Sequence, residues 1–237
     1  MKGIILAGGS GTRLAPMTDI NNKHLLYVHG KMIIDYPIQT ILNAGITDLR
    51  VVLGGNHFSQ VVSYLKDGSD FGLSITYTYQ KKPSGIAQAI NLCEDFTQDD
   101  RFMVVLGDNI FENPIKPSES KNSQISLYSH KELTRFGVAS LSGRKIVKIE
   151  EKPVKIDYSY DNYAITGCYI FDYNFYKYFN TTTPSLRGEF EITDIIRKYH
   201  EDGCLDYNFV EGMWSDAGTH ESLQYVNNFF FLKDQKI

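Results

Sequence analysis

The chain has 237 residues, of which 42% are hydrophobic and 22% are charged, and this is the composition of an ordinary globular protein with a large core. The formal net charge of -4 argues against a general nucleic-acid binder, which needs a basic face. It does not exclude a small phosphate-bearing ligand, because local cations and backbone N–H groups can hold one inside an acidic chain.

The sequence also argues against a membrane protein and against a protein stabilised by disulfides. No apolar run approaches membrane-spanning length. The apolar run 3–7 is too brief for the hydrophobic region of a signal peptide, and no small-residue cleavage site follows it. The three cysteines are widely spaced and lack a C-x-x-C pair, which predicts buried free thiols rather than disulfides or a zinc site. We therefore expect a cytoplasmic protein that does not bind a membrane.

The first 112 residues alternate between strand and helix patterns. Short apolar runs predict buried strands, and runs with apolar residues on one stripe predict helices. The expected strands are 2–7, 49–53, 73–79 and 102–106, and the expected helices are 34–44, 57–65 and 85–92. Such alternation predicts parallel strands with helices on both faces, and ligands of such sheets lie outside the carboxyl ends of the strands.

The remaining residues have a less regular pattern. The expected strands are 124–129, 137–141, 145–150 and 163–171, and the expected helices are 191–200 and 220–231. Residues 113–122 are polar and contain two prolines, which predicts a surface loop. No repeat, low-complexity tract or linker interrupts the chain, so we predict one domain spanning residues 1–237.

The loop 8–14, GGSGTRL, follows the first expected strand, so its glycines allow backbone N–H groups to approach an anion. A Rossmann fingerprint fails because Leu14 stands where the third glycine is needed, and a Walker loop fails because no Gly-Lys-Ser/Thr occurs. Two interpretations remain. One is a glycine-rich turn with a surface arginine; the other is a phosphate loop in which Arg13 offers a planar fork and Lys23 a second cation.

The motifs downstream of this loop resemble, in order, those of the sugar-1-phosphate nucleotidylyltransferases, and in particular the short form of the glucose-1-phosphate thymidylyltransferases. The resemblance covers nearly the whole chain and is carried by residues 8–14, 23–26, 80 with 83–89, 106–111, 150–153, 163–167, 187–194 and 214–220. It implies a Rossmann-like three-layer α/β/α fold with a mixed, mostly parallel central sheet. Residues 1–112 would form a nucleotide-binding half and residues 113–237 a sugar-phosphate-binding half.

The resemblance also implies a reaction, in which a nucleotidyl group passes from dTTP to glucose 1-phosphate and gives dTDP-glucose and pyrophosphate. UTP, or another hexose or aminosugar 1-phosphate, is the alternative. The attacking phosphate oxygen is already ionised, so catalysis requires positioning and charge neutralisation rather than a general base. The product would feed deoxysugar or polysaccharide synthesis, and the expected assembly is a homodimer or homotetramer.

The same resemblance implies the roles of five charged residues. Asp108 and Asp216 would hold Mg²⁺, for which carboxylates are usual ligands. Arg13 and Lys23 would contact the phosphates of the nucleotide, and Lys152 would bind and align the sugar phosphate. We therefore predict Arg13, Lys23 and Lys152 as the catalytic residues.

Substrate recognition is implied for a second set of residues. Gln80 would read thymine or uracil through one donor and one acceptor of its amide, with the backbone of Gly85 completing the contact. Glu151 would accept hydrogen bonds from sugar hydroxyls, and Trp214 would be a flat wall of the hexose pocket or a core residue. The predicted nucleotide-binding residues are Leu6, Ala7, Gly8, Gly9, Gly11, Thr12, Arg13, Gln80, Pro83 and Gly85, and the predicted sugar-phosphate-binding residues are Gly137, Glu151, Lys152, Ile165 and Trp214.

Two features depart from the family pattern. Segment 154–162 is longer than the corresponding link in the family and lies between Lys152 and Ile165, so we expect the determinant of hexose preference there. The chain ends soon after the last expected helix, as in the short form, which predicts weaker or different feedback inhibition by the product. The aromatic run 227–232 would lie at an interface between copies or on a buried helix face.

Two rival functions fit the sequence less well. A nucleotide-sugar-dependent glycosyltransferase would need a D-x-D motif after an apolar strand, whereas the strand at 102–106 is followed by Gly-Asp-Asn with one aspartate. A non-catalytic relative would have lost the charged residues that the reaction requires. All five are present in this sequence, which favours the enzyme: Arg13, Lys23, Asp108, Lys152 and Asp216.

Overall fold

Four strands of the first half form a parallel block in the computed structural model, which describes residues 1–235. These strands are β1 (Lys2–Ala7), β4 (Asp48–Leu53), β5 (Ser74–Tyr79) and β6 (Phe102–Leu106). β1 lies between β4 and β6, and β5 pairs with β4. Ile4 and Ile5 enter different hydrophobic cores, because successive side chains of a strand point to opposite faces of the sheet.

The second half extends the same sheet with mostly antiparallel strands. They are β8 (Ser123–Tyr128), β9 (Gly137–Ser142), β10 (Lys145–Glu151), β11 (Asp161–Phe171) and β12 (Leu205–Phe209). β11 joins the halves, since it pairs antiparallel with β6, β8 and β9. The order β10-β9-β11-β6-β1-β4-β5 therefore runs through both halves, with β8 beside β11 and β12 parallel to β8. β12 was not predicted from the sequence.

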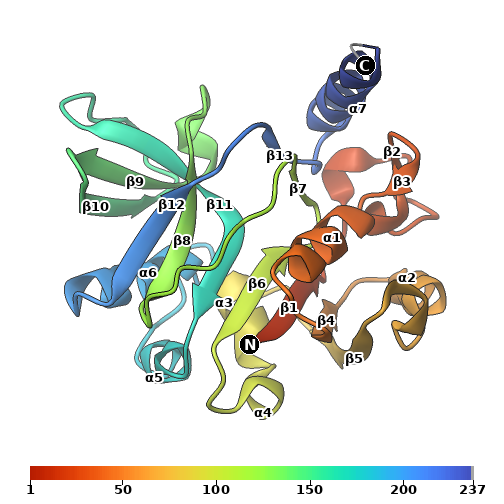
Figure 1. The fold of residues 1–237 in the computed structure, drawn as a ribbon, viewed down its shortest axis with the longest axis horizontal. Helices are drawn as coiled ribbons and strands as arrows, with labels where there is room; N and C mark the ends of the chain where they lie inside the picture. The colour runs from red at the N-terminus through yellow and green to blue at the C-terminus, as the bar shows by residue number, and fades with distance from the viewer. Residues whose placement is uncertain (236–237) are drawn as a thin grey trace.

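Helices cover both faces of this sheet (Figure 1). They are α1 (Asp35–Asn43), α2 (Phe58–Leu65), α3 (Ile86–Asn91), α4 (Glu94–Thr97), α5 (Asn174–Phe179) and α6 (Ile192–Glu201). The buried residues of α1 and α2 share one core, and those of α3, α5 and α6 share the other. The predicted three-layer α/β fold with a mixed central sheet is confirmed.

A third cluster of apolar residues packs the C-terminal helix α7 (His220–Asp234) against a separate two-stranded sheet formed by β7 (Asn109–Phe111) and β13 (Trp214–Asp216). Thr219 and Ser222 form a capping box at the start of α7, which satisfies free N–H groups of its first turn. The hairpin of β2 (Tyr27–Val28) and β3 (Lys31–Met32) packs nearby. Within residues 1–235, no helix combines the length and apolar character needed to cross a membrane.

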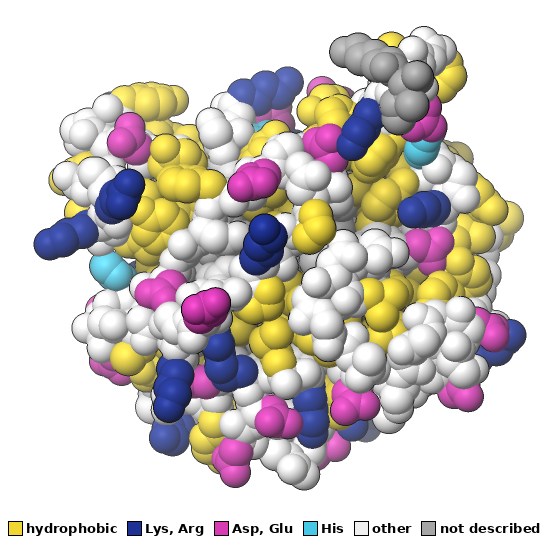
Figure 2. Space-filling model, viewed as in Figure 1, with side chains coloured by type: hydrophobic (Ala, Val, Ile, Leu, Met, Phe, Trp, Pro, Cys, Tyr) yellow, Lys and Arg dark blue, Asp and Glu magenta, His cyan; other side chains and the backbone are white. Residues whose placement is uncertain are grey.

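Surface chemistry and the cysteines complete the description. On the face shown in Figure 2, acidic and basic side chains are interspersed, and apolar side chains gather beside α7. All three cysteines are free thiols. Cys93 and Cys168 are buried as predicted, but Cys204 is partly exposed, because it lies in the turn between α6 and β12 rather than inside an element.

Candidate active site

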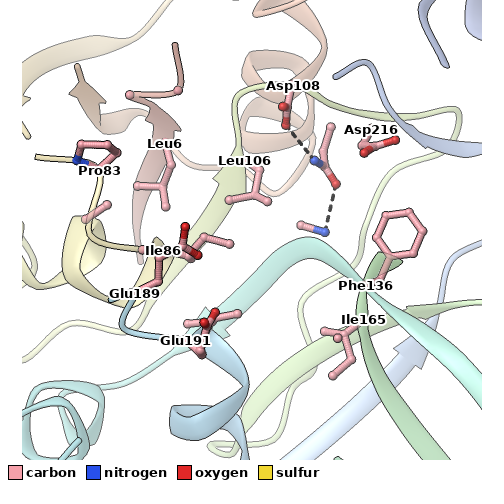
Figure 3. A pocket seen from close by; sticks show the side chains of 18 of the residues that line it. Leu6, Pro83, Ile86, Leu106, Asp108, Phe136, Ile165, Glu189, Glu191 and Asp216 are labelled. Atoms are coloured by element: carbon pink, nitrogen blue, oxygen red, sulfur yellow. Dashed lines mark hydrogen bonds between the residues drawn. The ribbon is translucent and has the colours of Figure 1, made fainter. Parts of the chain in front are cut away.

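A cavity of about 440 Å³ opens where the parallel strands of the first half end and is closed by strands and loops of the second half (Figure 3). Most of the predicted site residues meet in its lining, although they are spread over more than two hundred positions. They are Leu6, Gly8, Gly9, Arg13, Lys23, Gln80, Pro83, Gly85, Asp108, Gly137, Glu151, Lys152, Ile165, Trp214 and Asp216. Three predicted nucleotide-binding residues, Ala7, Gly11 and Thr12, do not line it; the side chain of Ala7 lies in the core.

The glycine-rich loop is shaped around Lys23. A Cβ atom on Gly9 would lie 3.0 Å from the Nζ of Lys23, so a side chain there would displace the ammonium group. Lys23 begins a short 3-10 turn, Lys23–Leu25, whose first residues are capped by the side chain of Asn22. Arg13 is exposed in the preceding turn, Thr12–Leu14, and makes no ion pair within residues 1–235. Lys23 is therefore held in place beside the loop, whereas Arg13, within the loop, has no ion-pair partner among the described residues.

Asp108 follows β6 directly and forms the tightest ion pair of the site. Its Oδ2 lies 2.6 Å from the Nζ of Lys23, and its Oδ1 accepts a hydrogen bond of 3.0 Å from the amide of Asn109. Burial disfavours the charged carboxylate, but Lys23 and His24, together with these hydrogen bonds, outweigh it and hold the pKa of Asp108 below its usual range. Asp108 is therefore ionised at neutral pH.

The carboxylate of Asp216 lies beside that of Asp108, although Asp216 belongs to β13, much later in the chain. In the antiparallel pair of β13 and β7, Asp216 lies opposite Asn109, which places its carboxylate beside Asp108. A Cβ atom on Gly218 would lie 3.6 Å from Oδ2 of Asp108 and 3.8 Å from Oδ2 of Asp216. Burial and the Asp108 carboxylate raise the pKa of Asp216 to about 6, against the opposing effect of Arg135.

The donor set of these two carboxylates fits a hard divalent cation. Mg²⁺ is usually held by one or two carboxylates, with phosphates of the substrate and water as the other ligands. Within the described residues, no group of three or more His, Cys, Asp or Glu side chains could hold a metal, so phosphates and water would have to complete the coordination. A cation between Asp108 and Asp216 would also relieve the repulsion that raises the pKa of Asp216.

Arg135 was missed by the sequence reasoning. One of its terminal nitrogens lies 3.3 Å from Oδ2 of Asp216, and the other lies 2.8 Å from the carboxylate of Glu132. Its guanidinium group faces the ring of Phe136, which in turn packs edge-on against Trp214. The sequence feature that could have identified Arg135 is its position two residues before Gly137, a residue predicted to line the hexose pocket.

The opposite end of the cavity carries an amide in an apolar setting. Gln80 is 8% exposed, and its Nε2 donates hydrogen bonds to Oε1 of Gln88, at 2.7 Å, and to the carbonyl oxygen of Gly85, at 3.4 Å. The prediction that Gln80 offers a ligand both a donor and an acceptor is therefore corrected: its donor is engaged within the protein. Gly85 has φ +101°, and a Cβ atom there would lie 2.5 Å from the carbonyl oxygen of Phe190.

A network of charged side chains forms the wall of the second half. Oε2 of Glu151 accepts a hydrogen bond of 3.1 Å from Thr193, and Oε1 accepts one of 3.1 Å from Arg187. Arg187 also contacts Glu191 at 2.8 Å. Lys152 is half-exposed beside Glu151, with φ of 40°, a left-handed conformation that is strained for a lysine. Glu151 is thus held rigidly, and its free acceptor capacity is smaller than the sequence suggested.

Trp214 lies both in a hydrophobic core and in the lining of the cavity. Its side chain is 3% exposed, so most of its surface is packed within the protein. Its indole N–H donates a hydrogen bond of 2.8 Å to Oδ1 of Asn109, and the same oxygen accepts the N–H of Gly167 at 2.9 Å. Asn109, which was not predicted as a site residue, therefore links Asp108, Trp214 and β11, and part of this chain of bonds is drawn in Figure 3.

Segment 154–162 does not reach the cavity. None of its residues belongs to the lining, and Val154 is fully exposed. Glu151 lies opposite Gly137 at one end of β9, whereas Asp161 lies opposite Leu141 near the other end, so the segment leads away from the end of β9 that lines the cavity. The expectation that it contains the determinant of hexose preference is not supported by this placement.

Glycines at strand ends, paired carboxylates and cations on both sides of one cavity are the parts of an enzyme that transfers a phosphate-linked group. The profile of the nucleotidyl transferase family matches residues 2–231. The chain belongs to this family, and its resemblance to glucose-1-phosphate thymidylyltransferases is confirmed.

Individual relatives cover nearly all of the chain. Glucose-1-phosphate thymidylyltransferase of Neisseria meningitidis is 41% identical over 97% of this chain and 82% of its own length. Low-salt glycan biosynthesis nucleotidyltransferase Agl11 of Haloferax volcanii is 36% identical over 100% of this chain and 68% of its own length. A Bacillus anthracis crystal structure, assigned as a glucose-1-phosphate thymidylyltransferase and solved in complex with a sucrose, has a TM-score of 0.90 and 46% identity, covering 97% of this chain and 94% of the other.

Proposed function

We propose that the protein transfers a thymidylyl group from dTTP to glucose 1-phosphate and releases pyrophosphate. The observation that carries the proposal is the meeting of Lys23, Asp108, Lys152 and Asp216 around one cavity that also contains Gln80. The names of the relatives favour dTTP over UTP as the nucleotide. The glycan role in the name of the Haloferax volcanii relative supports a place in sugar biosynthesis.

The reaction needs orientation and charge neutralisation. The sugar phosphate oxygen attacks the α-phosphorus of the nucleotide, and pyrophosphate leaves from the opposite side. Lys152, on the wall of the second half, aligns the attacking phosphate, while Arg13 and Lys23 neutralise the nucleotide phosphates. Asp108 and Asp216 would hold Mg²⁺, which when bound would neutralise the phosphates and polarise their oxygens.

Assembly and location belong to the same proposal. Tyr225, Phe231 and Leu232 are each about half exposed on α7, which supports a homodimer or homotetramer that uses this helix. The three free thiols support a reducing location such as the cytoplasm. Sedimentation of the wild type against Phe231→Lys would test the interface: loss of the oligomer is expected, and an unchanged assembly would exclude α7 from it.

A substrate matrix tests the activity. Pyrophosphate release is measured for dTTP, UTP, dCTP, ATP and GTP, each with glucose, galactose and glucosamine 1-phosphates. The highest kcat/KM is expected for dTTP with glucose 1-phosphate. Equal or higher kcat/KM with another pair would assign a different substrate, and glycosyl transfer without pyrophosphate release would reject the reaction.

A further inference from the structure

The Gln80 side chain is fixed by two partners on the same side of its amide. Nε2 donates to Oε1 of Gln88 at 2.7 Å and to the carbonyl oxygen of Gly85 at 3.4 Å. Oε1 of Gln80 lies on the other side, where a Cβ atom on Gly8 would be only 3.0 Å away. Within the described residues this oxygen accepts no hydrogen bond, and both Gln80 and Gly8 line the cavity. A nearly buried amide thus presents only its acceptor to a ligand.

The orientation of this amide follows from the chemistry of its neighbours. A backbone carbonyl can only accept, so the atom of Gln80 that faces Gly85 must be the NH₂ group. The shorter contact, to Gln88, is the stronger of the two bonds. Without Gln88, only the long contact to Gly85 would oppose a rotation that exchanges the oxygen and the nitrogen of Gln80.

The two ends of the Gln80 amide suit different pyrimidines. The N–H of Gly85 makes no hydrogen bond within the described part of the chain, so this end of the cavity offers one acceptor and one donor. Thymine and uracil present an N3–H donor next to the O4 acceptor, which complements that pair. Cytosine has an unprotonated N3 that needs a donor, so it would face the oxygen of Gln80 with no hydrogen bond.

We propose that Gln88 is a specificity-determining positioning residue, which holds the Gln80 amide with its oxygen toward the base and thereby excludes cytosine. Gln88 acts through Gln80. A polar group that is left unpaired when a base covers it discriminates strongly between substrates, and Gln80 is nearly buried, so the fixed amide sets the preference between the imide bases and cytosine. The proposal rests on the proposed nucleotidyl transfer.

Two variants of Gln88 separate orientation from simple packing. Gln88→Leu fills a similar volume but removes the acceptor, whereas Gln88→Glu keeps an oxygen that accepts the hydrogen bond from Gln80. The kcat/KM for dTTP and for dCTP is measured for both variants and for Gln39→Leu, a change at an exposed glutamine on α1. In Gln88→Leu the ratio of dTTP to dCTP is expected to fall about tenfold, chiefly through better use of dCTP.

The Glu variant and the Gln39 control should keep the wild-type ratio within about threefold, since both retain an acceptor beside Gln80. An unchanged ratio in Gln88→Leu, or an equal loss in Gln88→Leu and Gln88→Glu, would overturn the proposal. If the enzyme prefers UTP, the proposed substrate fails but the UTP to CTP ratio makes the same test. If no nucleotide is turned over, calorimetric binding of dTDP and dCDP to each variant replaces the rates.

Discussion

The two halves of the cavity are built by different means. In the first half, loops that follow the parallel strands bring backbone atoms and single side chains to the site, and small residues such as Gly8 and Gly9 make room for Gln80 and Lys23. In the second half, Glu151 at the end of β10 accepts side-chain hydrogen bonds from Thr193 of α6 and from Arg187 in the loop before α6. One wall depends on the path of the backbone, the other on paired charges.

This difference indicates how each wall should respond to substitution. A backbone-built wall should lose its shape when a glycine in it gains a Cβ atom, because the backbone cannot move aside without disturbing the adjoining strand. A charge-built wall fails when one partner is neutralised, since the remaining partners lose their orientation. Asp108 and Asp216 stand where the two walls meet, and both are needed for the proposed chemistry.

The largest effect is expected at this meeting point. Asp108→Asn keeps the shape of the side chain but removes the charge that pairs with Lys23 and would bind Mg²⁺. We expect kcat/KM to fall by about 10³-fold and Mn²⁺ binding, followed by electron paramagnetic resonance, to weaken. Asp48→Asn, at an exposed aspartate that begins β4, is the control. Normal activity in Asp108→Asn would show that the metal assignment is wrong.

The next effect concerns stability at the contact between the halves. In Gly85→Ala, the new Cβ would lie 2.5 Å from the carbonyl oxygen of Phe190 at a backbone φ of +101°. We expect the free energy of unfolding to fall by about 3 kcal/mol and the Tm by roughly 6–12 °C. Calorimetry measures both quantities.

Gly143→Ala is the matched control, because its φ is +60° with nothing within 4 Å of the added atom. It should cost only about 1 kcal/mol, the conformational part of the penalty. Equal losses in the two variants would mean that the contact with Phe190 is unimportant. The prediction of one domain over residues 1–237 is tested in the same experiment, since two separate transitions would contradict it.

The sequence predicted the backbone-built wall better than the charge-built wall, for a physical reason. The strands β1, β4 and β6 each end in a run of apolar residues because both of their faces are buried there, so their ends and the loops that follow could be located. β12 has the mixed sequence LDYNF and pairs with β8, about eighty residues earlier, so no local pattern identified it. Arg135 and Thr193 were missed because their roles depend on partners far away in the chain.

A smaller effect is expected when the charge-built wall is weakened. Glu151→Gln removes the charge that holds Arg187 and lies 3.6 Å from the Nζ of Lys152. The KM for glucose 1-phosphate should rise about tenfold, while the KM for dTTP stays unchanged. Glu150→Gln is the control, since Glu150 is outside the lining. A parallel rise in both KM values would refute the assignment of the charge-built wall to the sugar phosphate and of the backbone-built wall to the nucleotide.

The smallest effect is expected in segment 154–162. Because Val154 and Tyr158 are exposed and lie outside the cavity, the double substitution Val154→Ser with Tyr158→Ala should leave hexose preference unchanged and alter the free energy of unfolding by less than about 0.5 kcal/mol. The kcat/KM values for glucose, galactose and glucosamine 1-phosphates measure the preference. Ile165→Ala, in the cavity lining, should change it because it enlarges the pocket. The opposite pattern would return the determinant to the segment that the sequence favoured, and would require that segment to move toward the site when substrates bind.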